Sequence, residues 1–261
     1  MLFLFTDSYA AFKKQQFLPL VLGVAPGKSH LPEIIQHADN AQNKNNFYQQ
    51  EILMSGKHFD KAAAGWDQKQ RRVELAAKIA SAISSTLPLH KKMTGLEYGC
   101  GTGLVGLALA PELATLTAVD TSNGMLEVLA GKIKEEKISN VTPLCLDLLQ
   151  EPLNERFDLI FCAMTLHHIK EADQLLARFC ELLAAGGYLA VADLQAEDGS
   201  FHDAEADGIM HHGFHPEDLV KTLTDLGLTQ VSVKEVHSII KTNDAGVERA
   251  YPVFLLSGKK V

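Results

Sequence analysis

The stretch LEYGCGTGLVG, residues 96–106, decides the fold because it carries two nucleotide-binding patterns at once. Starting from Gly101 it reads G-x-G-x-x-G, the glycine spacing of dinucleotide-binding enzymes. Starting from Glu97 it reads E-x-G-x-G-x-G. Both patterns need a strand, a tight glycine turn and a helix. They differ in the ligand that they favour, since only the second places a carboxylate at the mouth of the loop.

Two kinds of segment alternate after this loop and predict an α/β fold. Short, almost wholly apolar runs predict strands, and stretches with helical spacing separate them. Such alternation indicates a doubly wound parallel sheet with helices on both faces. The expected strands are residues 94–98, 115–120, 141–147, 157–164, 187–194, 230–240 and 251–259. The expected helices are residues 68–86, 104–110, 124–137, 171–184 and 216–226.

The last two expected strands should form a hairpin. Only TNDAGVER, residues 242–249, separates them, and this is too short for a crossover helix. They should therefore pair in the antiparallel direction at one edge of the sheet.

Two parts of the chain differ in character. Residues 1–53 carry equal numbers of acidic and basic side chains and include the Asn/Gln-rich segment AQNKNNFYQQ. Met54 then opens a stretch that would make a natural protein start. We expect residues 1–53 to be a dispensable, disordered extension. Residues 54–261 would form one domain, with residues 54–90 as an N-terminal arm and helix over its binding site.

Charge and composition limit the classes of binding partner and the cellular compartment that we expect for this protein. A formal net charge of −8 argues against binding to the phosphate backbone of a nucleic acid. No apolar stretch reaches the ~18 to 20 residues of a membrane-spanning helix. The four cysteines form no C-x-x-C pair and are best explained as free thiols. These features predict a cytoplasmic protein with no nucleic-acid or membrane partner.

The carboxylate of Glu97 separates the two candidate ligands. If a dinucleotide were bound, the repulsion between this carboxylate and a phosphate charge 4 Å away would be ~4 kcal/mol, for an effective dielectric near 20. The ammonium of S-adenosylmethionine would instead be attracted, and the carboxylate of that ligand can use N–H groups at the helix start. Glu97 therefore favours S-adenosylmethionine over a nicotinamide cofactor.

Two further acids end neighbouring strands. Asp120 is placed to accept both hydroxyls of an adenosine ribose, although a helix-capping role is the alternative. Asp147 follows the third strand, where its carboxylate could accept from the amino group of adenine or simply be solvated. Met125 could pack on the adenine face, or fill the core.

The segments LEYGCGTG, AVDTSNGML, LCLDLL, FDLIFCAMTLHHI and GGYLAVADL together resemble the class I S-adenosylmethionine-dependent methyltransferases. More narrowly, the F-D-x-x-A-x-x-W-D segment at residues 59–67 resembles the small-molecule "methyltransferase domain" group. The resemblance covers residues ~56 to 258 and implies a seven-stranded sheet of order 3-2-1-4-5-7-6 with strand 7 antiparallel. The cofactor-binding residues that we expect are Glu97, Gly99, Cys100, Gly101, Gly103, Asp120, Thr121, Met125, Asp147, Leu148 and Ala163.

The resemblance also limits the acceptor. Methylases of amino groups on nucleobases or glutamine usually carry an N-P-P-Y-like tetrad after strand 4, and residues 162–165 read CAMT here. With the acidic charge, this argues for a small molecule instead.

Histidines are the natural candidates for a general base, since their pKa lies near neutrality. His167 and His212 are the catalytic candidates, whereas we interpret His168 as structural. Phe59, Trp66 and His211 are expected to contact substrate or to form a lid. The alternatives are that Trp66 anchors this arm to the sheet and that His211 is a surface residue. His211 and His215 have the i, i+4 spacing of a metal pair, but Gly213 and Pro216 oppose a helix there, so no metal is expected.

Two rival functions remain open. An NAD(P)-dependent oxidoreductase would share the fold, but the expected domain, residues 54–261, contains no Tyr-x-x-x-Lys or similar hydride-transfer pair; the YAAFK of residues 9–13 lies in the N-terminal extension. A non-catalytic module that binds S-adenosylmethionine would share the whole pattern, because methyl transfer requires no particular residue. The acceptor and the oligomeric state are not determined by the sequence.

Overall fold

The computed structural model describes residues 58–202, 208–242 and 247–261. The predicted extension, residues 1–53, lies outside the described residues. The strands are β1 (Thr94–Tyr98), β2 (Thr115–Asp120), β3 (Val141–Cys145), β4 (Phe157–Ala163), β5 (Leu183–Leu194), β6 (Leu228–Thr242) and β7 (Glu248–Lys260). The helices are η1 (Ala63–Gln68), α2 (Gln70–Thr86), α3 (Leu104–Leu109), η2 (Ala110–Glu112), α4 (Asn123–Glu136), η3 (Leu166–His168), α5 (Ala172–Leu182) and α6 (Pro216–Asp225).

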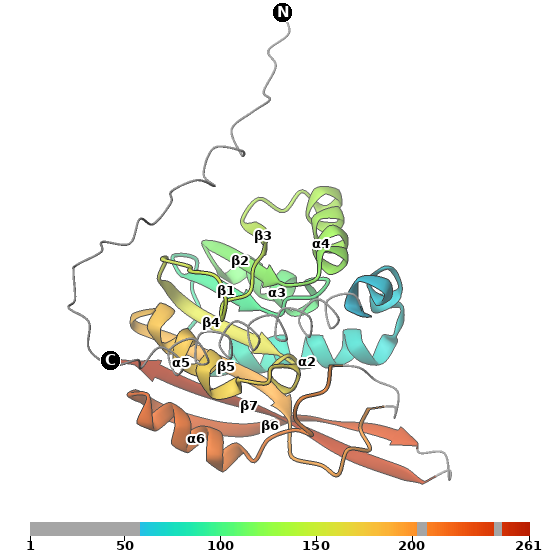
Figure 1. Ribbon diagram of the computed structural model, residues 1–261. Coiled ribbons are helices and arrows are strands. Elements are labelled where there is room, and N and C mark those ends of the chain that lie inside the picture. The colour runs from blue at the N-terminus through green and yellow to red at the C-terminus, as the bar shows by residue number, and fades with distance from the viewer. Residues whose placement is uncertain (1–57, 203–207, 243–246) are drawn as a thin grey trace, which may run out of the picture. The chain divides into compact units, whose positions relative to one another are not determined.

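All seven strands form one sheet with the order β3-β2-β1-β4-β5-β7-β6, which confirms the predicted topology (Figure 1). Strands β1 to β5 pair in parallel, and β7 is antiparallel to both β5 and β6. The strand order reverses beside β1. In open α/β sheets, ligands bind at such a switch point, outside the carboxyl ends of the strands.

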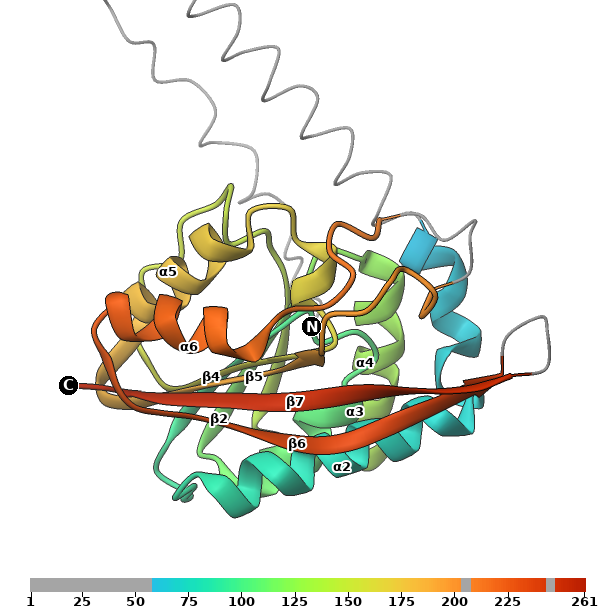
Figure 2. The same cartoon turned by 90° about the horizontal axis from the view of Figure 1, so that it is seen from below.

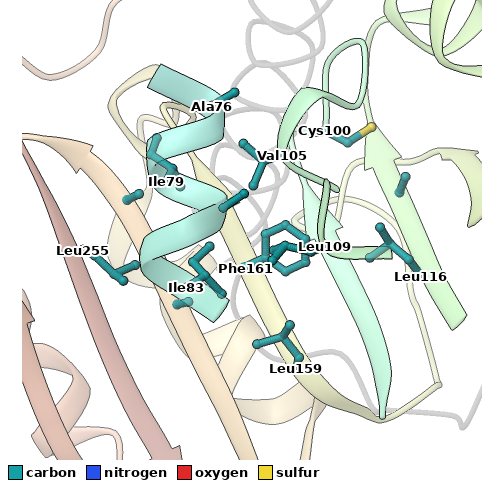
Figure 3. Close-up of a cluster of buried hydrophobic side chains, with 14 of the residues drawn as sticks. Ala76, Ile79, Ile83, Cys100, Val105, Leu109, Leu116, Leu159, Phe161 and Leu255 are labelled. Atoms are coloured by element: carbon teal, nitrogen blue, oxygen red, sulfur yellow. The ribbon is translucent and has the colours of Figure 1, made fainter. Parts of the chain in front are cut away.

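Helices cover both faces of the sheet, as Figure 2 shows for α2 on one side and α5 and α6 on the other. Alternate residues of each central strand point to opposite layers. In β4, Leu159 and Phe161 pack with α2, α3 and α4, whereas Ile160 and Cys162 pack with α5 and α6. Figure 3 shows the first layer, in which residues of α2 and α3 lie against Phe161 and its neighbours.

Several element boundaries differ from expectation, among them the starts of α2 and β5 and the end of β3. The expected helix 68–86 is preceded by the 3-10 turn η1 and begins as an α-helix only at Gln70. Strand β3 ends at Cys145, because the side chain of Asp147 accepts a hydrogen bond from the N–H of Leu149 and turns the chain. Strand β5 begins earlier than expected, at Leu183, where its pairing with β4 is irregular.

Within the described part of the chain, no helix is both long enough and apolar enough to cross a lipid bilayer.

Candidate functional site

A cavity of about 920 Å³ opens at the carboxyl ends of β1, β2 and β4. It gathers most of the residues that the sequence singled out, from five separate segments of the chain. Those lining it are Phe59, Trp66, Glu97, Gly99, Cys100, Gly101, Asp120, Thr121, Met125, Asp147, Ala163 and His167.

The loop after β1 depends on backbone conformations that favour glycine. Gly99, Gly101 and Gly103 have φ values of 68°, 53° and 83°. A Cβ on Gly99 would lie 2.2 Å from Cγ2 of Thr165, whereas one on Gly101 would meet nothing within 4 Å. Gly101 therefore leaves its side of the cavity open to a ligand. Gly103 is not among the lining residues; it precedes α3 as its N-cap.

Asp120 is fixed by backbone donors at the end of β2. Its Oδ2 accepts from the N–H of Gly101 at 2.7 Å, and its Oδ1 accepts from the N–H of Ser122 at 2.8 Å. Burial raises the pKa of Asp120, and these two hydrogen bonds offset part of the increase. Each carboxylate oxygen keeps a further lone pair. Asp120 is therefore oriented to accept hydroxyl groups of a ligand in the cavity. The helix-capping role falls to Ser122, whose Oγ accepts from the N–H of Met125 at 3.2 Å.

Glu97 is almost fully buried, and its Oε2 has no hydrogen-bond partner. A Cβ on Gly106 would come within 2.1 Å of this atom. The third glycine of G-x-G-x-x-G thus makes room for the carboxyl group of Glu97, so the two sequence patterns describe one arrangement. Burial raises the pKa of Glu97 to about 8, the charge of Asp120 adds to the increase, and the backbone N–H of Gly106 offsets part of it.

The raised pKa corrects the electrostatic argument made from the sequence. A carboxyl group with a pKa of about 8 is mostly neutral at pH 7 in the free protein. It acquires its charge only when a nearby cation lowers that pKa. Preference for a cationic ligand at Glu97 would therefore require the carboxyl group to ionise as the ligand binds, because little of its charge is present beforehand.

The segment after β3 provides a second polar wall. Asp147 lines the cavity, and its Oδ1 lies 3.4 Å from the hydroxyl of Tyr98, which donates to it. Burial raises the pKa of Asp147. Leu148 does not line the cavity, which corrects its predicted place. Its side chain is buried in the hydrophobic layer of α5 and α6, and Leu149 lines the cavity instead.

An aromatic arm closes the other side. The rings of Phe59 and Trp66 meet edge to face with centroids 5.7 Å apart. The guanidinium of Arg72 stacks 3.4 Å from the centre of the Trp66 ring. Phe59 also contacts the ring of His168, at 5.2 Å between centroids. The arm thus joins the glycine-loop side of the cavity to its histidine side.

The two aspartates of F-D-x-x-A-x-x-W-D hold this arm, a role that sequence reasoning missed. Oδ1 of Asp60 accepts from Oγ of Ser122 at 2.6 Å and from the N–H of Gly124 at 2.8 Å. Oδ1 of Asp67 accepts from Oγ1 of Thr102 at 2.6 Å, and Oδ2 pairs with Lys132 at 2.5 Å. The motif therefore fastens the arm to the loop after β1 and to the start of α4. The two acidic residues of the motif, Asp60 and Asp67, were the feature of the sequence that could have indicated this role.

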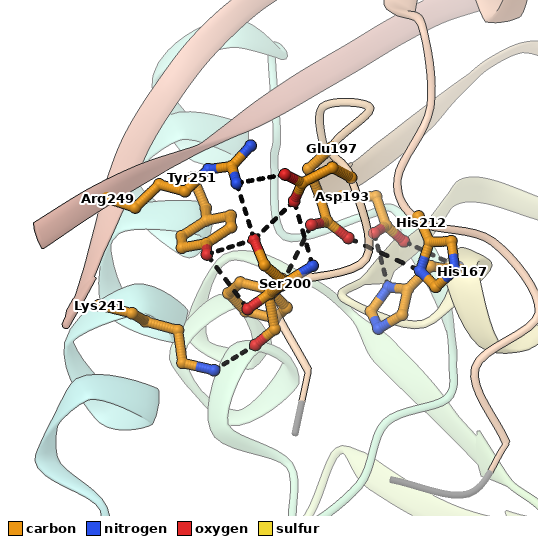
Figure 4. Close-up of polar contacts among 10 residues, drawn as sticks. His167, Asp193, Glu197, Ser200, His212, Lys241, Arg249 and Tyr251 are labelled. Atoms are coloured by element: carbon orange, nitrogen blue, oxygen red, sulfur yellow. Dashed lines mark hydrogen bonds and ion pairs between the residues drawn. The ribbon is translucent and has the colours of Figure 1, made fainter. Parts of the chain in front are cut away.

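Three histidines meet at the far end of the cavity. His167, His168 and His202 all line it, although the sequence suggested only His167 of these three as a catalytic candidate. Nδ1 of the buried His167 lies 2.6 Å from Oδ1 of Asp193 at the end of β5, and Nδ1 of His168 lies 2.8 Å from the carbonyl oxygen of Gly208. Figure 4 shows Asp193 directed at His167.

The surroundings keep two of these imidazoles neutral. Burial, followed by the charge of His167, lowers the pKa of His168 to about 3. The same two causes, with Lys241, lower the pKa of His202 to about 4. Burial opposes ionisation of Asp193, but its contact with His167 brings the net pKa below the ordinary value.

The later histidines lie outside the cavity lining, which corrects two predictions. Nε2 of His211 lies 2.9 Å from the carbonyl oxygen of Ile169. The side chain of His212 is 60% exposed and lies 3.7 Å from Glu197 (Figure 4). The backbone explains both placements, since residues beside Phe214 pair with the end of β5 and hold this segment along the strand. His212 is therefore no longer a catalytic candidate, and His211 is no longer a substrate contact.

Comparison with known proteins gives consistent matches. Residues 96–187 match a family model described as a methyltransferase domain. An uncharacterized methyltransferase of Schizosaccharomyces pombe is 30% identical over 156 residues, which are 54% of this chain and 55% of that protein. A malonyl-[acyl-carrier protein] O-methyltransferase of Acetivibrio thermocellus is 28% identical over 137 residues, 51% of this chain and 46% of that protein. The chain thus spans about half the length of these relatives.

The fold has many solved counterparts. The structure of a DhpI–SAH complex superposes with a TM-score of 0.60 at 22% identity, covering 79% of this chain and 96% of that one.

Proposed function

The chain belongs to the class I S-adenosylmethionine-dependent methyltransferases, and we propose that it transfers a methyl group from this cofactor to a small-molecule acceptor in the cavity. The observation that carries the proposal is a cavity lined by both Glu97 and Asp120, in which the buried carboxyl group of Glu97 has one oxygen without a hydrogen-bond partner. The carboxyl group of Glu97 suits an ammonium group of the ligand, and the carboxylate of Asp120 suits the hydroxyl groups of a ribose.

The residues present fit the cofactor. Glu97 would receive the ammonium, and the open side of Gly101 admits a ligand close to the backbone. Asp120 would hold the ribose hydroxyls, with Thr121 beside it. Asp147 and Leu149 would border the adenine, next to Met125, and Ala163 would border the methionine moiety. When bound, the cofactor supplies a methyl carbon on a sulfonium, which an acceptor atom displaces in line.

The chain itself would orient the acceptor and exclude water. Phe59 and Trp66 form the apolar side of the acceptor region, opposite the glycine loop. His168 and His202, whose pKa values are lowered, offer uncharged ring nitrogens that can accept a hydrogen bond from an O–H, N–H or S–H group of the acceptor. His167 is the remaining candidate for a general base, since Asp193 would stabilise the imidazolium that forms when Nε2 takes the proton.

A small acceptor is supported by the cavity. Its volume of about 920 Å³ lies near the upper end of the usual range of about 300–1,000 Å³ for small-molecule sites. This leaves room for a cofactor and an acceptor together. The relative from Acetivibrio thermocellus is named for methylation on oxygen. The acidic net charge and the absence of an N-P-P-Y-like tetrad still argue against a nucleobase.

Calorimetric titration with S-adenosylhomocysteine, NADH and NADPH tests the cofactor first. We expect S-adenosylhomocysteine alone to bind. Asp120→Asn should weaken its affinity at least tenfold, or about 1.4 kcal/mol. Asp225→Asn, the same change on the exposed face of α6, is the matched control and should leave affinity unchanged.

Turnover is tested next, with methyl-labelled S-adenosylmethionine and a panel of phenols, alcohols, thiols, amines and carboxylates. Label transfer to one of these classes supports the enzyme. Tight binding of cofactor without transfer to any acceptor favours the non-catalytic module, and binding of a nicotinamide cofactor refutes the proposal.

A further inference from the structure

The three histidines at the far end of the cavity are arranged as metal ligands. His167, His168 and His202 each offer a ring nitrogen, and these nitrogens all lie within 4.8 Å of one another. Their ring centroids are 4.1 Å, 5.1 Å and 6.0 Å apart. We propose that these three residues bind a divalent transition-metal ion, for which zinc is the best match. The proposal concerns metal binding alone and does not depend on the proposed methyl transfer.

The outer partners of two rings support this assignment. A metal-binding histidine usually donates its other N–H to a carboxylate or a backbone carbonyl, which fixes the tautomer and the ring orientation. Nδ1 of His167 has Asp193 as that partner and Nδ1 of His168 has the carbonyl of Gly208. With both protons held there, the Nε2 atoms present lone pairs.

His202 adds an independent observation. Its Nδ1 is buried and has no hydrogen-bond partner. A buried polar atom without a partner costs about 1–3 kcal/mol, so such an atom calls for an explanation. Coordination of a metal ion would supply the missing partner. The ring of His202 packs against that of His167, with centroids 5.1 Å apart, so the residue with the unpartnered nitrogen is a member of the cluster.

Charge and ligand type favour a zinc-like ion. Neutral imidazole is a good ligand for Zn²⁺, and all three side chains of this cluster are histidines. The buried carboxylate of Asp193 offsets the opposing charge of Lys241. Tetrahedral Zn–N bonds of about 2.0–2.1 Å would place the nitrogens about 3.3 Å apart, so the nitrogens need to approach one another by at most about 1.5 Å on binding.

Three protein ligands leave a fourth position open, as in catalytic rather than structural zinc sites. Because all three histidines line the cavity, that position is available to a small molecule inside it. An alcohol, phenol or thiol that binds there would lose its proton more readily. Coordination would then replace proton uptake by His167.

The test uses full-length, tag-free protein, so that no added histidines contribute. Metal is removed with a chelator, and Zn²⁺ is titrated against a competing chromophoric chelator. Co²⁺ is added in parallel, because tetrahedral Co²⁺ gives intense visible absorption. We expect one ion per chain, and we expect His168→Ala and His202→Ala each to weaken affinity at least tenfold. His212→Ala and His215→Ala, on exposed side chains outside the cavity, are the matched controls and should bind as the unmodified protein does.

Circular dichroism and thermal denaturation establish that each variant is folded. If a variant does not fold, the Co²⁺ spectrum of the unmodified protein still shows whether a metal ion binds. Failure of the unmodified protein to bind Zn²⁺ in competition would overturn the proposal. So would binding that His168→Ala and His202→Ala leave unchanged, or that is lost only in the control variants.

Discussion

Replacing Glu97 by glutamine should change how the stability of the protein depends on pH. The native carboxyl has a pKa of about 8, against 4.5 for an ordinary glutamate. Between these values the native state holds a proton that the unfolded state releases. The free energy of unfolding therefore falls as pH rises through this window, by up to about 1.4 kcal/mol per pH unit from this group alone. Stability from Glu97 is complete below pH 4.5 and is lost above about pH 8.

Glutamine has the shape of the neutral carboxyl group but does not titrate. Groups such as Asp120 titrate in both proteins, so they largely cancel in the comparison. Between about pH 5.5 and about pH 7.5, the free energy of unfolding of Glu97→Gln should therefore rise by about 3 kcal/mol relative to that of the unmodified protein. Over the whole window the difference approaches roughly 5 kcal/mol.

Urea denaturation of both proteins at several pH values measures this difference. The change of the difference with pH is the decisive quantity, because it does not depend on how well the glutamine amide is accommodated. Parallel pH profiles would refute the conclusion that Glu97 is neutral in the native protein.

The same protonation should be visible on binding of S-adenosylhomocysteine. If its ammonium approaches Glu97, up to about 0.9 proton is released at pH 7, because a group with a pKa of about 8 is about 90% protonated there. Calorimetry in buffers of different ionisation enthalpy measures the release, and Glu97→Gln should abolish it. Equal proton release in both proteins would place the ammonium elsewhere.

Two other substitutions test the loop and the arm. Gly99→Ala should destabilise the protein more than Gly101→Ala, because both need a left-handed backbone at about 1–2 kcal/mol but only Gly99 would also clash with Thr165; equal urea midpoints would contradict this. Asp60→Ala removes two hydrogen bonds from the start of α4, worth about 0.5–1.5 kcal/mol each. Hydrogen exchange should then accelerate in residues 58–68 but not in β4, and unchanged exchange in the arm would show that Asp60 does not hold it.

The fold was predictable because its determinants are local and periodic. Apolar runs such as residues 157–164 and 187–194 mark buried strands whatever surrounds them. The short connection between the last two strands permits only an antiparallel pair. The resemblance supplied the strand order, and the structure confirmed it. Boundaries were less predictable, because they depend on side chains such as Asp147, whose hydrogen bond to Leu149 ends β3 early.

The meeting of several expected cofactor residues in one cavity was predictable for a related reason. Glu97, Gly101 and Asp120 end strands or lie in the loop that follows one, and the parallel topology brings such positions to one edge of the sheet. Leu148 and Leu149 could not be told apart, because adjacent residues in a turn point in different directions. The protonation of Glu97 was also beyond the sequence, since it depends on how deeply α3 buries the carboxyl group.

The histidine side could not be predicted, because it depends on contacts between distant segments. The sequence contains histidines at positions 202, 211, 212 and 215, and nothing local distinguishes His202 from the others. The distinction arises where the end of β5 holds residues near Phe214 along the strand, which places His212 beside Glu197. His202 instead lies against His167. The sequence did hold one signal for this side: Asp193 is an acid at the end of an otherwise apolar strand, as Asp120 is. An acid in that position needs a buried partner, and the histidine after β4 provides it.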